Sequence, residues 1–325
     1  MVTRRASLVA IQAMVLPAWC GSARSDQPYP SRPISIVVPQ AAGGASDVTA
    51  RAVAERMRSA LGQPFVVENR AGATGDIGIR SVAVSQPDGY TLVQVSAANT
   101  ANQSARPARA YPISEQLRPI GRTGISAFSL VVPKSLGIAT LADFIGHAKA
   151  RPGQLAYASI GYGSSQHLVM EMFCAAAGLS LNHVPYRGET AATPDLMAGR
   201  VQAMFMAGAK TLLPGGSVVA LGTTNRTPWP SLPDLPPLGT LPGLREFHYN
   251  GWNGLMAPLK TPDAIVNKVS HALVAALRED SMLATLRTIG FEPGPGTPQD
   301  MAEQIRTDLV NFKRIISERH LTFPD

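Results

Sequence analysis

PISIVVPQAAGGASDVTAR, residues 33–51, predicts a strand that enters a helix through a glycine turn. Its first half is a β-branched run bounded by prolines, as in a short buried strand, and its second half has helical spacing. Ser46 or Asp47 can cap that helix, and Gly43 and Gly44 let the backbone approach a ligand closely. Free amide groups at the positive end of a helix hold anions. The turn therefore predicts an anion seat, and the alternative is an ordinary strand-to-helix turn with nothing bound.

A second stretch, GYGSSQHL at 161–168, repeats this arrangement. A predicted strand ends at Ser159, and Ser164 or Ser165 can cap the helix that follows. The stretch indicates a second anion seat in another part of the chain. On these residues alone, an ordinary capped helix is an equally good interpretation.

The rest of the chain alternates short β-branched runs with amphipathic helical segments. This alternation is typical of parallel sheets flanked by helices. The proline-rich stretch 226–243 cannot form a regular helix or an inner strand, so it predicts a long surface connection. With 325 residues, the chain is long enough for two domains that each bury a core.

The N-terminus predicts a secretory signal. Arg4 and Arg5 precede an apolar run from Leu8 to Trp19, and small residues follow up to Ala23, where we expect cleavage. A first core helix is the alternative. Cys20 offers a site for lipid attachment, but the bulky residue before it is a poor match to a lipoprotein signal. We therefore expect a soluble periplasmic protein.

Charge and composition exclude several classes of function. Removing residues 1–23 takes away two arginines, which leaves 27 basic against 22 acidic residues and a net charge of +5. A modest basic excess can draw anionic solutes toward a cleft, whereas no dense Lys/Arg block predicts a nucleic-acid partner. No later stretch supplies the ~20 apolar residues that a membrane span needs.

The cysteines and histidines predict no metal site and no cofactor. Cys174 would be the single cysteine of the mature chain, so we expect no intramolecular disulfide, and its apolar neighbours indicate a buried helix residue. The six histidines are scattered, without HExxH or HxH spacing.

Three further motifs carry a resemblance to a known family. They are PFVVENRAGATGDIGIRSVAVSQPDGYTLV (64–93), RPGQLAYASIGYGSSQHLVMEMF (151–173) and HVPYRG (183–188). Together with 33–51, in this order and spacing, they resemble the Bug family of extracytoplasmic solute-binding receptors of tripartite tricarboxylate transporters. The similarity runs from about Tyr29 to Leu321, nearly all of the mature chain.

This resemblance implies an α/β, two-lobed periplasmic-binding-protein fold of the Venus-flytrap type (type II), with a mainly parallel sheet in each lobe. The first lobe would comprise residues 27–126 and 250–325, and the second 127–249. It also implies a receptor without catalysis, which captures a small organic carboxylate in the inter-lobe cleft and passes it to membrane permease subunits. We expect a monomer.

In this family, both glycine-rich turns face the cleft and hold the two ends of a dicarboxylate-like ligand, largely through backbone N–H groups and water. The resemblance therefore implies two carboxylate seats, one on each lobe, and further polar contacts from neighbouring loops. Arg187 is a possible clamp for a carboxylate, and pairing with Glu189 is its alternative. The expected ligand-binding residues are Ala42, Gly43, Gly44, Asp47, Asn99, Thr100, Gly163, Ser164, Ser165, Tyr186, Arg187 and Gly188.

Two other functions remain open at this point. A secreted hydrolase would use Ser164 or Ser165, but residues 161–166 lack the Gly-x-Ser-x-Gly pattern and His167 is placed to pack on the helix. A sensory receptor of the same fold would present its closed form to a signalling partner.

The sequence also departs from the family at positions that bear on the ligand. Gln40 stands where many relatives have an aromatic residue. Met206 and Ala207 occupy the region where many relatives have an acidic residue, which points away from amino-acid ligands. The identity of the carboxylate stays open.

Overall fold

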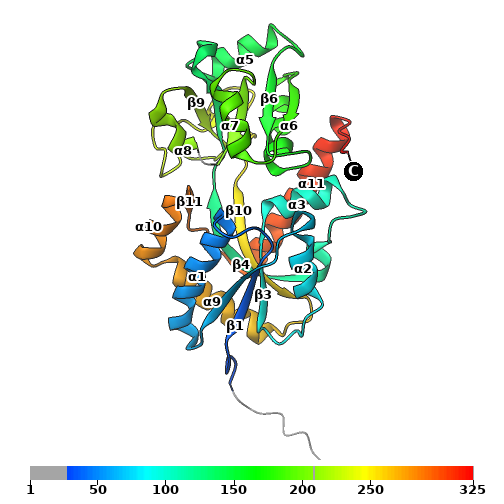
Figure 1. Cartoon of the computed structure of the whole chain (residues 1–325), viewed down its shortest axis with the longest axis vertical. Coiled ribbons are helices and arrows are strands. Elements are labelled where there is room, and N and C mark those ends of the chain that lie inside the picture. Colours follow the sequence, from blue (N-terminus) through cyan, green and yellow to red (C-terminus); the bar gives the residue numbers. More distant parts are fainter. Residues whose placement is uncertain (1–27, 208, 325) are drawn as a thin grey trace, which may run out of the picture.

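The chain folds into two α/β lobes, each built on one sheet (Figure 1). The computed structural model describes residues 28–207 and 209–324. The strands of the first lobe are β1 (Ile34–Val38), β2 (Phe65–Asn69), β3 (Thr91–Ser96), β4 (Leu117–Ser126), β10 (Gly251–Pro258) and β11 (Phe291–Glu292). Those of the second lobe are β5 (Ser129–Pro133), β6 (Ala156–Ser159), β7 (Asn182–Pro185), β8 (Ala203–Met206) and β9 (Val218–Thr223). The predicted two-lobed α/β fold is confirmed.

Helices pack on both sheets. The helices of the first lobe are α1 (Ala45–Leu61), α2 (Asp76–Ala83), α3 (Ala97–Ala105), α4 (Ile113–Gln116), α9 (Asp263–Leu277), α10 (Asp280–Thr288) and α11 (Pro298–Glu318). Those of the second lobe are α5 (Leu141–Lys149), α6 (Ser165–Ala177), α7 (Glu189–Met197) and α8 (Ala209–Leu212).

Both sheets are mixed rather than mainly parallel. The first has the strand order β11-β4-β10-β3-β1-β2, and the second β7-β6-β8-β5-β9. β1 is parallel to β2 and β3, but β10 is antiparallel to β3 and β4. The reason is the path of the chain. β10 enters the first lobe from the second, whereas β3 and β4 run toward the second lobe, so β10 is antiparallel to both. β5 enters the second lobe in the same way and is antiparallel to β8 and β9.

The central strand β1 is buried on both faces. Ile34, Ile36 and Val38 pack against α1 and α9, whereas Val37 faces α2 and α11 on the other side. All four side chains have no exposed surface. Burying each such side chain contributes ~1.5–3 kcal/mol, which explains why an unbroken β-branched run forms this strand.

The two crossings between the lobes lie side by side. The chain passes from β4 to β5 through Phe128, and it returns from β9 to β10 along a proline-rich connection. Thr224 N–H donates to the Phe128 carbonyl at 2.9 Å, and Tyr249 N–H donates to the Thr224 carbonyl at 2.7 Å. The rings of Phe128 and Tyr249 stack 5.6 Å apart. The lobe boundaries given by the sequence, 126/127 and 249/250, remain a prediction.

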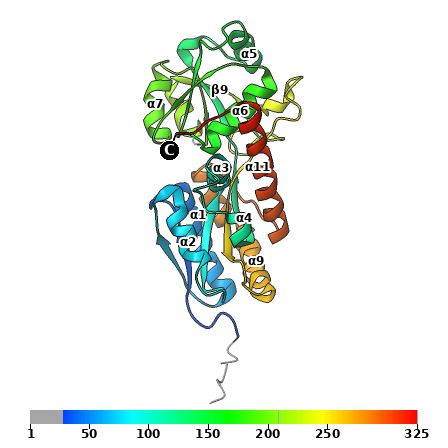
Figure 2. The same ribbon diagram turned by 90° about the vertical axis from the view of Figure 1, so that its right-hand side faces the viewer.

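The C-terminal helix makes a third link between the lobes. α11 packs on α3 and β4, and its far end reaches α6 of the second lobe (Figure 2). There Arg319 Nε donates to Glu171 Oε2 at 2.8 Å, and Tyr157 OH donates to Glu171 Oε1 at 2.5 Å. Glu171 is 4% exposed. We call the Arg319–Glu171 pair the inter-lobe tether.

Along the described part of the chain, no helix combines the length and apolar character that crossing a membrane requires. The predicted signal at 1–23, with Cys20, lies outside the described residues.

Candidate functional site

The candidate site lies where strands of the two sheets end facing each other. β1, β2 and β3 run parallel and end at the edge of the first sheet that faces the second lobe (Figure 1). β6, β7 and β8 likewise end at the edge that faces the first lobe. Ligands of α/β proteins bind at the carboxyl ends of such strands, where helices begin.

The turn before α1 presents backbone donors. Gly43 has a φ of +83°, a left-handed conformation that strains any residue with a side chain. Gly44 is the N-cap, and no side chain caps the helix, so the prediction of a Ser46 or Asp47 cap is wrong because the helix begins at Ala45. Among the described residues, the N–H groups of the four residues from Gly44 to Asp47 have no hydrogen-bond partner. The start of α1 therefore keeps unpaired amide donors and the positive end of its dipole.

Asp47 holds this turn in place from inside. Its side chain accepts hydrogen bonds from Gly43 N–H at 2.9 Å, from Arg51 Nε at 3.0 Å and from Asn69 Nδ2 at 2.9 Å. Asp47 is 3% exposed. Burial alone raises the pKa of Asp47, but the hydrogen bonds from Arg51, Gly43 and Asn69 outweigh it and bring the pKa below its ordinary value. Its predicted ligand contact stays a prediction, and its carboxylate here fixes the Gly43 peptide.

A polar residue that the sequence did not single out, Asn253, lies beside this turn. Ser46 Oγ donates to Asn253 Oδ1 at 3.2 Å, and Asn253 is 3% exposed. β10 runs antiparallel to β3 with Asn253 opposite Ser96, which brings residues far apart in sequence to the same edge. Asn253 was missed because its place at this edge follows from the strand pairing.

Asn99 and Thr100 belong to the start of α3. Asn99 Oδ1 accepts the Ser96 N–H at 2.9 Å, so it serves as part of a capping box. Thr100 has no exposed surface, and its hydroxyl donates to the Ala97 carbonyl at 2.8 Å. Thr100 is therefore buried in α3 of the first lobe, and its predicted ligand contact stays a prediction.

The second glycine turn leads into α6. Ser164 is the N-cap, and its Oγ accepts the His167 N–H at 3.3 Å, as the sequence predicts. Gly163 N–H donates to His167 Nδ1 at 3.0 Å, and Ser164 N–H donates to the Gly161 carbonyl at 3.2 Å. Those two amides are engaged, and within the described residues the N–H groups free of partners are those of Ser165 and Gln166.

Gly163 is also a contact between the lobes. Its φ is +69°, and a Cβ built on it would lie 2.5 Å from the Ala105 Cβ of the first lobe. Arg106 Nη1 donates to the Tyr162 carbonyl at 3.2 Å, so the C-terminal end of α3 rests on this turn. Glycine is therefore required here by its conformation and by the close approach of α3.

A stacked histidine pair supports the second turn. The rings of His167 and His183 lie 3.7 Å apart with an interplanar angle of 11°. Ser159 Oγ contacts His183 Nε2 at 2.7 Å and donates to the Gly161 carbonyl at 3.0 Å. Burial lowers the pKa of His167 to about 4, and burial together with the charge of His167 lowers the pKa of His183 to about 3. Both rings are therefore neutral at pH 7, and His167 can accept the Gly163 N–H.

The loop after β7 places Tyr186, Arg187 and Gly188 beside this turn. Tyr186 OH donates to Asp195 Oδ2 at 2.6 Å, and burial together with Asp195 raises the pKa of Tyr186 to about 12. Arg187 is exposed and forms no ion pair within the described residues. Glu189 instead accepts from Gln166 Nε2 at 3.2 Å, so the alternative that Arg187 pairs with Glu189 is not observed. Gly188 is the N-cap of α7.

A cavity of ≈ 690 Å³ lies between the lobes at this loop. Four predicted ligand residues line it on the second lobe: Gly163, Ser164, Tyr186 and Arg187. Its first-lobe wall includes Asn102 and Arg106, which sequence reasoning missed because no motif marks them. The turn of Ala42, Gly43 and Gly44 does not line this cavity. The structure thus brings four of the six predicted second-lobe residues to one cavity, and the first-lobe turn lies outside this cavity.

The serines of the second turn are not arranged for catalysis. Ser165 Oγ donates to Gln166 Oε1 at 3.2 Å, and the His167 ring already accepts the Gly163 N–H. A nucleophilic serine needs a base within hydrogen-bond reach of its hydroxyl. Within the described residues, no group of three or more His, Cys, Asp or Glu side chains could hold a metal ion.

Comparison with known proteins gives a consistent result. The family model of the tripartite tricarboxylate transporter family receptor matches residues 49–321. Protein BugT of Bordetella pertussis is 32% identical over 315 residues, which cover 96% of this chain and 96% of BugT.

Solved structures agree with these matches. An R. palustris protein solved with adipate is 32% identical, with a TM-score of 0.78, over 91% of this chain and 100% of that chain. MatC from Rhodopseudomonas palustris, solved with bound malate, is 27% identical, with a TM-score of 0.73, over 89% of this chain and 100% of that chain.

Proposed function

Because the chain belongs to the tripartite tricarboxylate transporter receptor family, we propose that it captures a small dicarboxylate between its lobes and delivers it to a tripartite tricarboxylate transporter. Members of this family are periplasmic solute-binding receptors rather than enzymes. The relatives solved with adipate and malate support a dicarboxylate as the ligand of this chain.

The observation that carries this proposal is the pair of helix starts at the facing edges of the lobes. α1 and α6 begin there, and each has at least two backbone amides without a partner among the described residues. A helix N-terminus carries roughly +0.5 of an elementary charge, so each seat favours one carboxylate. We place one carboxylate on Ala42, Gly43 and Gly44, with the amides that follow.

The other carboxylate lies on the turn of Gly163, Ser164 and Ser165, next to the free Gln166 amide. Arg187 is the additional clamp, because its guanidinium is exposed at the same cavity and has no ion-pair partner within the described residues. Tyr186 and Gly188 shape the loop that carries it.

Isothermal titration calorimetry tests this proposal with adipate and malate as probes. A diamine of the same length as adipate, 1,6-diaminohexane, is the matched control of opposite charge. We expect heat of binding from a dicarboxylate and none from the diamine. Binding of the diamine, or a crystal structure with the carboxylate away from both turns, would refute the assignment.

Export and delivery need their own tests. We infer that residues 1–23 are removed on export, so N-terminal sequencing of the periplasmic protein should begin at Arg24 rather than at Cys20 or Met1. Light scattering should give the mass of a monomer. Uptake of the bound dicarboxylate in cells should require both this protein and the permease subunits.

A further inference from the structure

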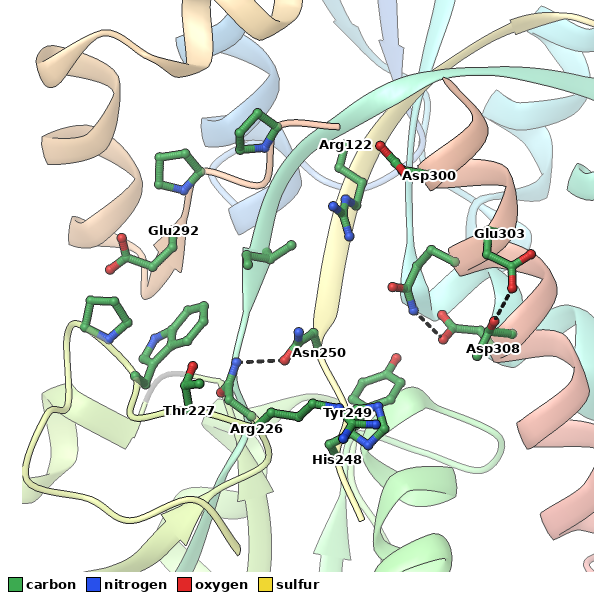
Figure 3. A pocket seen from close by; sticks show the side chains of 18 of the residues that line it. Arg122, Arg226, Thr227, His248, Tyr249, Asn250, Glu292, Asp300, Glu303 and Asp308 are labelled. Atoms are coloured by element: carbon green, nitrogen blue, oxygen red, sulfur yellow. Dashed lines mark hydrogen bonds between the residues drawn. The ribbon is translucent and has the colours of Figure 1, made fainter. Parts of the chain in front are cut away.

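A second cavity lies on the hinge side of the molecule, at the opposite end of the first sheet from β1 and β2. Its volume is ≈ 900 Å³. The first lobe contributes β4, the loop after β11 and one face of α11, and the connection between β9 and β10 closes it from the second lobe (Figure 3). None of the predicted ligand-binding residues lines it.

Two buried polar groups at this cavity lack partners. Tyr249 is 5% exposed, and its hydroxyl has no hydrogen bond within the described residues. Asn225 is 5% exposed, and its Oδ1 has none either, while its Nδ2 donates to Asn250 Oδ1 at 2.7 Å. Buried polar atoms are rarely left unpaired, because losing water without a replacement costs ~1–3 kcal/mol for each group. Figure 3 shows the Tyr249 hydroxyl pointing into the cavity.

The unpaired charges at the cavity are positive. Arg122 on β4 points into it (Figure 3), and its charge, after the hydrogen bonds from Thr297, lowers the pKa of Asp300. Neither Arg122 nor Arg226 has a hydrogen bond or an ion pair among the described residues. The acids of the lining, in contrast, already have donors. They are Glu292 with Arg287, Asp300 with Thr297, Glu303 with Arg306, and Asp308 with Trp252 and Gln304.

The wall opposite α11 is apolar. Trp229, Pro293 and Pro295 line it, and Trp229 is 5% exposed. Arg122 lies between this apolar wall and the polar face of α11 (Figure 3). The cavity thus offers a guanidinium and a phenol donor next to a surface that suits a hydrocarbon or ring.

We propose that this cavity is a second binding site, which takes a small organic anion with one carboxylate and an apolar body. Arg122 binds the carboxylate, Tyr249 donates a hydrogen bond to it, and Trp229 packs against the apolar body. The site is separate from the dicarboxylate cleft and does not depend on what that cleft binds.

Benzoate is the probe, titrated into the mature protein by calorimetry and by tryptophan fluorescence, because Trp229 lines the site. We expect saturable binding, and Arg122→Gln should weaken it at least ~10-fold, since a charge-assisted pair is replaced by a neutral amide. Tyr249→Phe removes only the hydroxyl and should weaken binding several-fold, which keeps the test valid should Arg122→Gln fold poorly. Gly44→Val, at the dicarboxylate turn, should leave benzoate binding intact.

Three results would overturn the proposal. They are no binding of benzoate, binding that Gly44→Val abolishes and Arg122→Gln spares, and Arg122-dependent binding of inorganic phosphate in place of benzoate. The last result would assign the cavity to inorganic anions, without the apolar body.

Discussion

Asp47→Asn tests whether the first anion seat depends on a residue that holds its backbone. The Asp47 carboxylate accepts hydrogen bonds from Gly43, Arg51 and Asn69. In the variant, an NH2 group replaces one carboxylate oxygen, so a donor faces other donors. At least one bond to the charged Arg51 and one bond to a neutral donor are weakened. A bond to a charged group contributes ~1.5–3 kcal/mol and a neutral one ~1 kcal/mol.

Arg51 is half-exposed, so water recovers part of this loss. We therefore expect Asp47→Asn to lower the free energy of unfolding by about 2–3 kcal/mol, which lowers Tm by ~4–8 °C. Affinity for adipate should fall as well, because the Gly43 peptide is no longer fixed. Denaturant unfolding, differential scanning calorimetry and titration calorimetry measure the three effects.

The pH dependence of the free energy of unfolding tests whether the ionised Asp47 carboxylate stabilises the folded protein. The folded-state pKa of Asp47 is lowered, so its stabilisation is present above the unfolded value of ~3.9 and is lost as pH falls through the folded value. The difference between wild type and Asp47→Asn should therefore shrink below pH 4. Asp234→Asn makes the same chemical change on an exposed loop and should shift stability by less than ~0.5 kcal/mol. Equal behaviour of the two variants at pH 7 would refute the reasoning.

Three further outcomes follow from the described contacts. The stacked histidine pair stays neutral in the folded protein, whereas histidines of the unfolded chain take up protons below their ordinary pKa of ~6.5. The free energy of unfolding should therefore fall between pH 6.5 and 4, and urea unfolding of His183→Asn should show a smaller fall over this range. Glu171→Gln breaks the inter-lobe tether and should lower the free energy of unfolding by ~1–3 kcal/mol, with a larger radius of gyration in small-angle scattering; an unchanged radius would contradict this role. Gly44 has an ordinary φ of −76°, whereas Gly43 has a φ of +83°. Gly44→Val should therefore weaken adipate binding through its side chain, without the loss of Tm that backbone strain should cause in Gly43→Val.

Much of the fold was predictable because segments that become buried are rich in apolar and β-branched residues. The strands β1, β2 and β3 are rich in apolar and β-branched residues, as the predicted alternation of short β-branched runs with helices requires. β4 was missed because it contains Gly121 and Gly124, which weaken the strand signal. Those glycines accommodate Leu273 and Phe291, neighbours that only the tertiary structure supplies.

The same limit applied to the site. Both glycine turns were predictable from their own residues, but which amides stay free was not. Gly163 N–H is engaged by a histidine four residues on, and Asp47 turns inward because Asn69 arrives from a different strand. α3 was missed because its sequence, AANTANQSA, is polar, and packing against α11 buries Asn99 and Thr100 all the same.

The inter-lobe tether changes what kind of joint this protein has. The two neighbouring crossings define a single hinge axis, and by themselves they would let the lobes rotate about this axis with little resistance. Arg319 and Glu171 form their ion pair away from this axis, so the pair must break before the lobes rotate far apart. Each ~1.4 kcal/mol of free energy in this ion pair changes the ratio of molecules with the pair formed to molecules with it broken tenfold. We therefore expect the tether to slow the opening of the proposed cleft, although neither of its residues is among the predicted ligand-binding residues.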